Sequence, residues 1–229
     1  MPEPSRRAEL TSRLEALTDR AERLVEAAGI FQSALRERDL RLVVVGGSAI
    51  TAWDPRIHTS LDIDFVGPGL RAELDDVFRG EFGLEVEGRH WYDVELRLAV
   101  ERPGVVLEPP GSEAVELETP SGAIVLVIAL EDLILDRVRE WDATGAYDAW
   151  VQAARMLAHA ALDRPRLDRR ASEVGVPDVL AVMEWLAAEH SAGRAIGVHE
   201  SHRAHDGMRG GGGLDGAMDA IASDAAEDL

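Results

Sequence analysis

The chain of 229 residues contains no cysteine. Disulfide bonds and thiolate metal sites are therefore excluded, and zinc ribbons and thiol catalysis are excluded with them. Lysine is missing as well, so all 24 basic residues are arginines. This second absence excludes any mechanism that needs a lysine, including the glycine-rich Walker loop, whose lysine contacts nucleotide phosphates.

Long hydrophobic runs are also missing. No apolar run is long enough to span a bilayer, and the first ten residues are polar and unlike a signal peptide. We therefore expect a soluble, cytoplasmic protein that does not bind a membrane. The hydrophobic content of 46 % is typical of a folded globular protein.

Positive charge is scarce relative to negative charge. The chain has 24 basic and 43 acidic residues, which gives a formal net charge of −19 at pH 7. A surface of this charge repels nucleic acid at long range, so broad binding to a phosphate backbone is not expected. A local basic pocket remains compatible with this composition.

The spacing of apolar residues predicts an α/β (α+β) fold, in which helices flank a mixed or largely antiparallel sheet and a C-terminal helical bundle follows. Four segments are expected: N-terminal helices packing on the core (1–39), the α/β core (40–129), a helical domain (130–190) and a flexible tail rich in Gly, His and Asp (191–229). Strands are expected at 41–45, 61–66, 84–86, 92–100, 105–108, 114–118 and 123–128. Helices are expected at 5–28, 30–38, 48–53, 70–82, 131–141, 147–162, 166–174 and 178–190.

A glycine turn follows the first apolar strand. Gly46, Gly47 and Ser48 come directly after the run Leu42–Val45 and directly before a predicted helix. Glycines let the backbone approach phosphates closely, while backbone N–H groups, a serine hydroxyl and the helix dipole all favour a phosphate at such a turn. These three residues are therefore candidate ligands of a nucleoside triphosphate such as ATP.

Two aspartates lie in the next apolar run. Asp62 and Asp64 are separated by one residue, so in a strand their side chains share a face about 6.5–7 Å apart. Carboxylate oxygens are the ligands that Mg²⁺ prefers. Two such ions, about 3.5–4 Å apart, can activate an attacking oxygen and stabilise a leaving pyrophosphate. The pair therefore predicts a two-ion magnesium site.

A third carboxylate from a neighbouring strand would complete this metal site. Glu108, at the end of the predicted strand 105–108, is the first choice. Asp93 and Glu95, spaced i and i+2 in the preceding predicted strand, are alternatives, and the spacing does not decide among the three.

These residues resemble the motifs of the nucleotidyltransferase superfamily with the polymerase-beta-like fold: Gly-Gly-Ser at 46–48, Asp-x-Asp at 62–64 and a later strand acid. The chain looks closest to the small prokaryotic branch of abortive-infection-type (AbiEii-like) toxins and related nucleotidyltransferases, because a segment like Glu131–Arg137 opens the helical half of that branch. Toxins of this type often carry a lysine where this chain has Arg137, and arginine can also bind phosphate. The resemblance implies Arg137 as a nucleotide ligand and an antitoxin as a protein partner.

The function expected from these patterns is magnesium-dependent transfer of a nucleotidyl group from an NTP to an acceptor hydroxyl. The acceptor could be an RNA end such as that of tRNA, a protein or a small molecule. Asp62, Asp64 and Glu108 are the expected metal ligands and catalytic residues. An alternative is a catalytically inactive module on the same fold that binds nucleotides or proteins.

Overall fold

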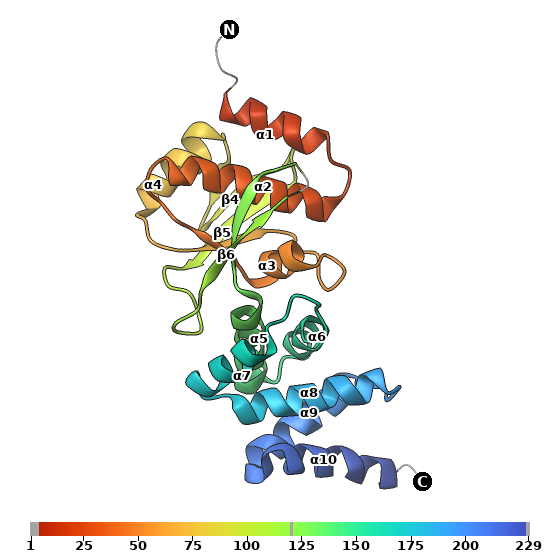
Figure 1. The fold of residues 1–229 in the computed structure, drawn as a ribbon. Helices are drawn as coiled ribbons and strands as arrows, with labels where there is room; N and C mark the ends of the chain where they lie inside the picture. The colour runs from red at the N-terminus through yellow and green to blue at the C-terminus, as the bar shows by residue number, and fades with distance from the viewer. Residues whose placement is uncertain (1–4, 120, 228–229) are drawn as a thin grey trace. The chain divides into compact units, whose positions relative to one another are not determined.

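The computed structural model describes residues 5–119 and 121–227, and side chains as far as residue 222. The chain folds as two compact units, Met1–Ala129 and Leu130–Leu229. Figure 1 shows the sheet in the first unit, while the second unit consists of helices. Among the described residues, none of the helices is both long and apolar enough to cross a membrane.

The first unit is built on a seven-stranded sheet with the order β3-β4-β5-β2-β1-β7-β6. Strand β1 pairs antiparallel with β2 and parallel with β7, and β2 pairs parallel with β5, while the outer pairs are antiparallel. The predicted mixed sheet flanked by helices is thereby confirmed. The strands are β1 (Val43–Val45), β2 (Ile63–Val66), β3 (Glu85–Glu87), β4 (His90–Asp93), β5 (Leu98–Gly104), β6 (Ala114–Glu118) and β7 (Ile124–Ile128).

The N-terminal helices break at a different place from the one predicted. The helices are α1 (Arg6–Glu15) and α2 (Arg20–Arg36), so the break lies before residue 20 rather than at Gly29. The Asp19 side chain caps α2 by accepting a hydrogen bond from the Glu22 N–H. Gly29 lies inside α2, where a Cβ atom would be 3.1 Å from the Ala123 Cβ, so this glycine allows the helix to approach β7 closely.

Gln32 joins α2 to two strands in the buried core. Its side-chain amide nitrogen donates to the Leu42 and Leu126 carbonyl oxygens at 2.9 and 2.8 Å, and its amide oxygen accepts from the Leu126 N–H at 2.7 Å. Gln32 is only 2 % exposed, so water cannot replace these bonds. One side chain therefore satisfies three backbone groups that would otherwise be buried without partners.

The predicted strand 92–100 is two strands joined by a turn. Strand β4 ends at Asp93 and β5 begins at Leu98. The Asp93 carboxylate accepts a hydrogen bond from the Leu96 N–H at 2.8 Å, and Arg97 takes a left-handed backbone conformation with φ 54°. A turn with arginine in this conformation carries no glycine or proline signal, which is why the sequence pattern missed it. Strand β5 then runs to Gly104, and the predicted strand 105–108 is a loop.

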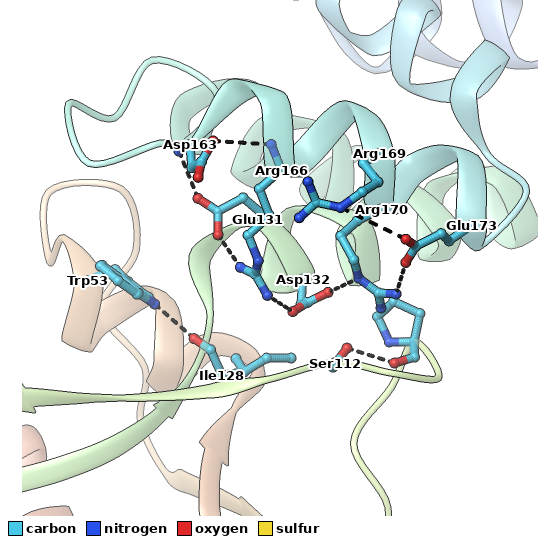
Figure 2. Close-up of polar contacts among 11 residues, drawn as sticks. Trp53, Ser112, Ile128, Glu131, Asp132, Asp163, Arg166, Arg169, Arg170 and Glu173 are labelled. Atoms are coloured by element: carbon cyan, nitrogen blue, oxygen red, sulfur yellow. Dashed lines mark hydrogen bonds and ion pairs between the residues drawn. The ribbon is translucent and has the colours of Figure 1, made fainter.

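The other helices of the first unit are α3 (Gly46–Trp53) and α4 (Arg71–Asp75), which continues into a π-helical turn, η1 (Asp76–Glu81). Phe78 on η1 packs against Phe31 of α2 and Trp91 of β4, with ring centroids 5.4 and 4.7 Å apart. Trp53, at the end of α3, donates from its indole nitrogen to the Ile128 carbonyl oxygen of β7 at 3.0 Å (Figure 2). These contacts hold α2, α3 and η1 on the sheet.

The described part of the second unit is helical as far as Glu227. Val198–Gly207 and Gly213–Glu227 are helices, where the sequence predicted a flexible tail over 191–229. Gly207 and Gly216 serve packing, because a Cβ atom on Gly207 would lie 2.3 Å from the Gly216 carbonyl oxygen. The helices are α5 (Leu130–Thr144), α6 (Tyr147–Met156), α7 (Arg164–Glu173), α8 (Pro177–Ser191), α9 (Val198–Gly207) and α10 (Gly213–Glu227), with a π-helical turn, η2 (Met208–Gly212), before α10.

A buried ion network joins α5 to α7 in the second unit (Figure 2). Asp132 is fully buried and accepts from Arg166 at 2.7 Å and from Arg170 at 2.9 Å. Arg166 also pairs with Glu131, whose carboxylate accepts from the Asp163 N–H at 2.8 Å. Burial favours the neutral form of Arg166, but the carboxylates of Asp132 and Glu131 raise its pKa above the ordinary value. Arg166 therefore keeps its positive charge at neutral pH.

We expect Gln32→Leu to lower the free energy of unfolding by about 2–5 kcal/mol, because it leaves three buried backbone groups without partners. Urea unfolding of the whole chain measures this. Ser33→Ala is the matched control, since Ser33 is the exposed neighbour on the same helix, and it should change stability by less than about 0.5 kcal/mol. Equal losses for the two variants would contradict the role assigned to Gln32.

We expect Asp132→Asn to lower the free energy of unfolding of the second unit by about 3–5 kcal/mol, because two arginines lose their shared counter-charge. Tryptophan fluorescence during urea unfolding follows this through Trp141 and Trp150, both buried in this unit. Asp168→Asn is the control. Its side chain is 57 % exposed and pairs with Arg164 at 3.0 Å, so its loss should stay below about 1 kcal/mol.

Candidate functional site

Three carboxylates meet where β2 and β5 lie side by side. Asp62, Asp64 and Glu101 each offer an oxygen atom, and these atoms all lie within 4.8 Å of one another. Asp64 faces Val45 across the antiparallel β1–β2 pair and Glu101 across the parallel β2–β5 pair. The strand register therefore places this acid group next to the residue at which β1 ends.

Glu101 takes the position that the sequence assigned to Glu108. Glu108 lies in the loop beyond β5 and is not part of the acid group. The alternatives Asp93 and Glu95 are not part of it either: Asp93 caps the β4–β5 turn and pairs with Arg7, and the Glu95 side chain is 88 % exposed. The predicted strand 105–108 is a loop. The β4–β5 turn instead starts β5 at Leu98, so Glu101 lies in the middle of the strand that pairs with β2.

The glycine turn lies directly against the acid group. Gly46 has φ +60°, and a Cβ atom on it would be 3.0 Å from the Asp64 Oδ2. A Cβ atom on Gly47 would be 2.9 Å from the His58 Nε2 and 3.2 Å from the Ser60 Oγ. Because glycine carries no side chain, the backbone at 46–47 can lie directly against the side chains of Asp64 and His58.

The first amides of α3 have no side-chain cap. The N-cap residue is Val45, which carries no hydrogen-bonding side chain. The N–H groups of the first turn of a helix have no partner within the helix and favour an anion. The turn therefore combines a helix start that favours an anion with the Asp64 carboxylate beside it.

Ser48 does not have the free hydroxyl that the sequence pattern suggested. Its Oγ donates to the Val45 carbonyl oxygen at 2.8 Å and accepts from the Asp64 N–H at 3.0 Å, and the residue is fully buried. A hydroxyl has a single proton, so in this arrangement it cannot also donate to a phosphate. Ser48 positions the start of α3 against β2, which orients the Asp64 backbone.

The neighbours of the acid group hold its carboxylates in place. Ser60 donates to the Asp62 Oδ1 at 3.0 Å. Glu101 lies 2.9 Å from the Arg89 Nε and 3.4 Å from the His90 Nδ1. Arg89 is 72 % exposed, so its charge is screened by solvent and offsets the three negative charges only in part.

This donor set fits a hard divalent cation. A group of three carboxylates offers only oxygen ligands, which is typical of Mg²⁺ or Mn²⁺ sites, whereas zinc prefers nitrogen and sulfur ligands. Like charges this close also repel one another, and a cation removes that repulsion. Asp62, Asp64 and Glu101 are therefore the residues that could hold magnesium.

Arg137, the remaining predicted nucleotide ligand, lies on α5 in the second unit. Its guanidinium pairs with Asp136 at 2.5 Å and with Glu140 at 2.6 Å. These two carboxylates hold the side chain along its own helix, and its binding to a nucleotide stays a prediction.

Two residues of this site escaped the sequence-based prediction. Glu101 directly follows an apolar run, as an acid in a buried strand would, and this was the available signal. His58 has no comparable signal, because only the return of the chain from α3 to β2 brings its ring over Gly47.

Comparison with known proteins gives one structural similarity. No protein-family model and no curated protein matches the chain. A solution structure of the antibiotic-resistance factor ANT(2'')-Ia is similar, with a TM-score of 0.43 and 21 % sequence identity, over 71 % of this chain and 92 % of that one.

We expect Mg²⁺ or Mn²⁺ to raise the melting temperature of the wild-type protein, because a ligand at about 100 times its Kd stabilises a fold by about 2.7 kcal/mol. Asp64→Asn and Glu101→Gln should abolish this rise, and Asp64→Asn should melt higher than wild type without metal because one repelling charge is gone. Differential scanning calorimetry with and without EDTA measures both effects.

Glu108→Gln is the control for the third metal ligand and should keep the full metal-induced rise. If Glu108→Gln lost the rise while Glu101→Gln kept it, Glu108 would be the third ligand and the grouping described above would be wrong.

Proposed function

We propose that this protein is a magnesium-dependent nucleotidyltransferase, which moves a nucleotidyl group from an NTP to an acceptor hydroxyl. One observation carries the proposal: the acid group lies against a glycine turn that begins a helix, with the Gly46 position 3.0 Å from the Asp64 carboxylate. Phosphoryl chemistry of this kind needs a held triphosphate and neutralised charge more than covalent catalysis.

The glycine turn binds the triphosphate in this proposal. The backbone amides of Gly46 and Gly47 donate to phosphate oxygens, and the α3 dipole favours the negative charge. The His58 Nε2 lies beside the same backbone and can donate to a phosphate oxygen when that nitrogen carries a proton. Ser48 supports the turn through its bonds to Val45 and Asp64.

Asp62, Asp64 and Glu101 hold magnesium, which when bound supplies positive charge to the triphosphate and to the acceptor oxygen. The acceptor oxygen forms a bond to the α-phosphorus, and the bond between the α-phosphorus and the bridging oxygen breaks, so that pyrophosphate leaves. The acceptor proton passes to a carboxylate oxygen of Glu101, the third acid. Ser60 keeps Asp62 oriented through its hydrogen bond.

A narrower form of the proposal rests on sequence resemblance alone. The motif residues resemble abortive-infection-type toxins, so the enzyme would act in the cytoplasm as a toxin, with an antitoxin as partner and Arg137 as a further triphosphate ligand. Its acceptor would be a tRNA end or a protein.

A second candidate function is a nucleotide-binding module that carries out no reaction. The ion pair between Glu101 and Arg89 favours this alternative, because Arg89 competes with a metal ion for the Glu101 carboxylate.

Transfer of label tests the proposal. The protein is incubated with magnesium and NTPs labelled at either the α- or the γ-phosphate, together with RNA, protein and small-molecule acceptors. Label should move only from the α-position, with release of pyrophosphate. Glu101→Gln should slow transfer about 10²–10⁴-fold, the usual contribution of a general base.

Glu108→Gln is the matched control and should transfer label at nearly the wild-type rate. Transfer from the γ-position would identify a kinase instead. Binding of NTP without transfer to any acceptor would favour the inactive module, and unchanged transfer by the variant Asp62→Ala/Asp64→Ala would refute the assigned mechanism.

A further inference from the structure

A cavity lies in the first unit, at the edge of the sheet where β2 begins. Its volume is about 440 Å³. Three parts of the chain surround it: the connection from α1 into α2, Leu61 before β2, and the β4–β5 turn. The lining residues that matter here are Leu61 and the arginines Arg20, Arg23 and Arg97, and we call this space the arginine cavity.

The topology places the arginine cavity at the same edge of the sheet as the proposed active site. Strand β1 ends at this edge with Val45, opposite Asp64 near the start of β2. Strand β5 is parallel to β2 and antiparallel to β4, so the β4–β5 turn lies at this edge too. The two sites lie on opposite faces of the sheet at this edge, because Leu98 lines the cavity and shares a strand face with Val100, whereas Glu101 points to the other face.

The charge of the arginine cavity is opposite to that of the chain. Three arginine residues line it, and its one acidic residue, Glu95, lies 3.5 Å from Arg7 outside the cavity. In the part of the chain that the structure describes, neither Arg20 nor Arg97 forms an ion pair. A chain with a net charge of −19 therefore keeps two arginines without a carboxylate partner at this cavity.

Two of the arginines occupy positions that local structure disfavours. Arg20 is the first residue of α2, where the helix dipole repels a cation. Arg97 has φ 54°, a conformation that glycine and asparagine adopt more easily. Residues that oppose local preference in this way are typical of functional sites.

The third arginine is held in place. Arg23 donates to the Leu14 carbonyl oxygen and, at 3.1 Å, to the Leu96 carbonyl oxygen of the β4–β5 turn. Carbonyl oxygens satisfy its N–H groups without neutralising its charge. Arg23 thus joins the N-terminal helices to the turn that carries Arg97, and it orders the cavity wall.

We propose that the arginine cavity binds a phosphate ester. This inference goes beyond the proposed nucleotidyltransferase function and does not depend on contact between the cavity and the acid group. Guanidinium groups match phosphate oxygens in pairs, and three of them around one compact space suit a phosphate better than an extended acidic peptide. The exposed side chain of Leu61 offers an apolar wall for a base or sugar.

The phosphate could belong to an RNA end or to a small phosphorylated molecule, and a binding experiment without NTP distinguishes them. Fluorescence anisotropy follows a labelled short RNA oligonucleotide on the full chain, against the same oligonucleotide with uncharged methylphosphonate linkages. Glycerol 3-phosphate and an acidic peptide serve as competitors. We expect the RNA to bind at least about tenfold more tightly than its uncharged analogue.

The variant Arg20→Gln/Arg97→Asn should weaken RNA binding at least about tenfold and reduce the slope of log Kd against log salt by about one to two. Its melting temperature should not fall, because asparagine suits the left-handed position of Arg97 better than arginine does. Arg79→Asn is the matched control: Arg79 is exposed in the same unit but outside this cavity, and its variant should bind within about twofold of wild type.

Displacement of the RNA by glycerol 3-phosphate at similar concentration would assign the cavity to small phosphorylated molecules. Unchanged binding by the double variant, equal binding of the uncharged analogue, or displacement by the acidic peptide alone would each overturn the proposal. If the double variant fails to fold, the single variant Arg20→Gln replaces it in the same binding test, because Arg20 is exposed at the start of α2. This experiment measures binding and not transfer, so its result stands whether or not the proposed enzyme activity is found.

Discussion

The register between three neighbouring strands is the constraint on which the site depends. Val45 faces Asp64, and Asp64 faces Glu101, so the end of β1 and the two acidic strands meet at one point. A shift of β2 by one residue would turn both aspartates to the other face of the sheet. The buried Ser48 hydroxyl secures this register, since it joins the Val45 carbonyl oxygen to the Asp64 N–H.

The surrounding structure supports that register through buried polar groups rather than through apolar packing alone. Gln32 bridges residues next to β1 and within β7, and Trp53 ties the end of α3 to β7. Gln32 thereby holds α2 against the centre of the sheet, and Trp53 holds α3, the helix that begins with the glycine turn. Three carboxylates lie against the glycine turn on one face of the sheet, and the arginine cavity lies at the same sheet edge on the other face, so the sheet separates the acidic site from the basic one.

Local patterns in the sequence were sufficient for the parts of the site that lie close together along the chain. Gly46 has a positive φ that favours glycine, and a side chain on Gly47 would meet His58. Asp62 and Asp64 share a face because strand side chains alternate. The tail shows the limit of composition as a guide. A run rich in glycine was expected to be flexible, but Gly207 and Gly216 allow α9 and α10 to touch backbone to backbone.

The sequence by itself determined the mixed sheet, the glycine turn and the aspartate pair, because each depends on residues within one or two neighbouring elements. Only the tertiary structure decided the third acid and the arginine cavity. Glu101 reaches Asp64 through a parallel strand pairing, and Arg97 of the β4–β5 turn meets Arg20 and Arg23 of α2 although the two segments are far apart in the chain. Pairing between distant segments depends on the packing of the whole unit, and the pattern of apolar residues within a short stretch of sequence does not predict it.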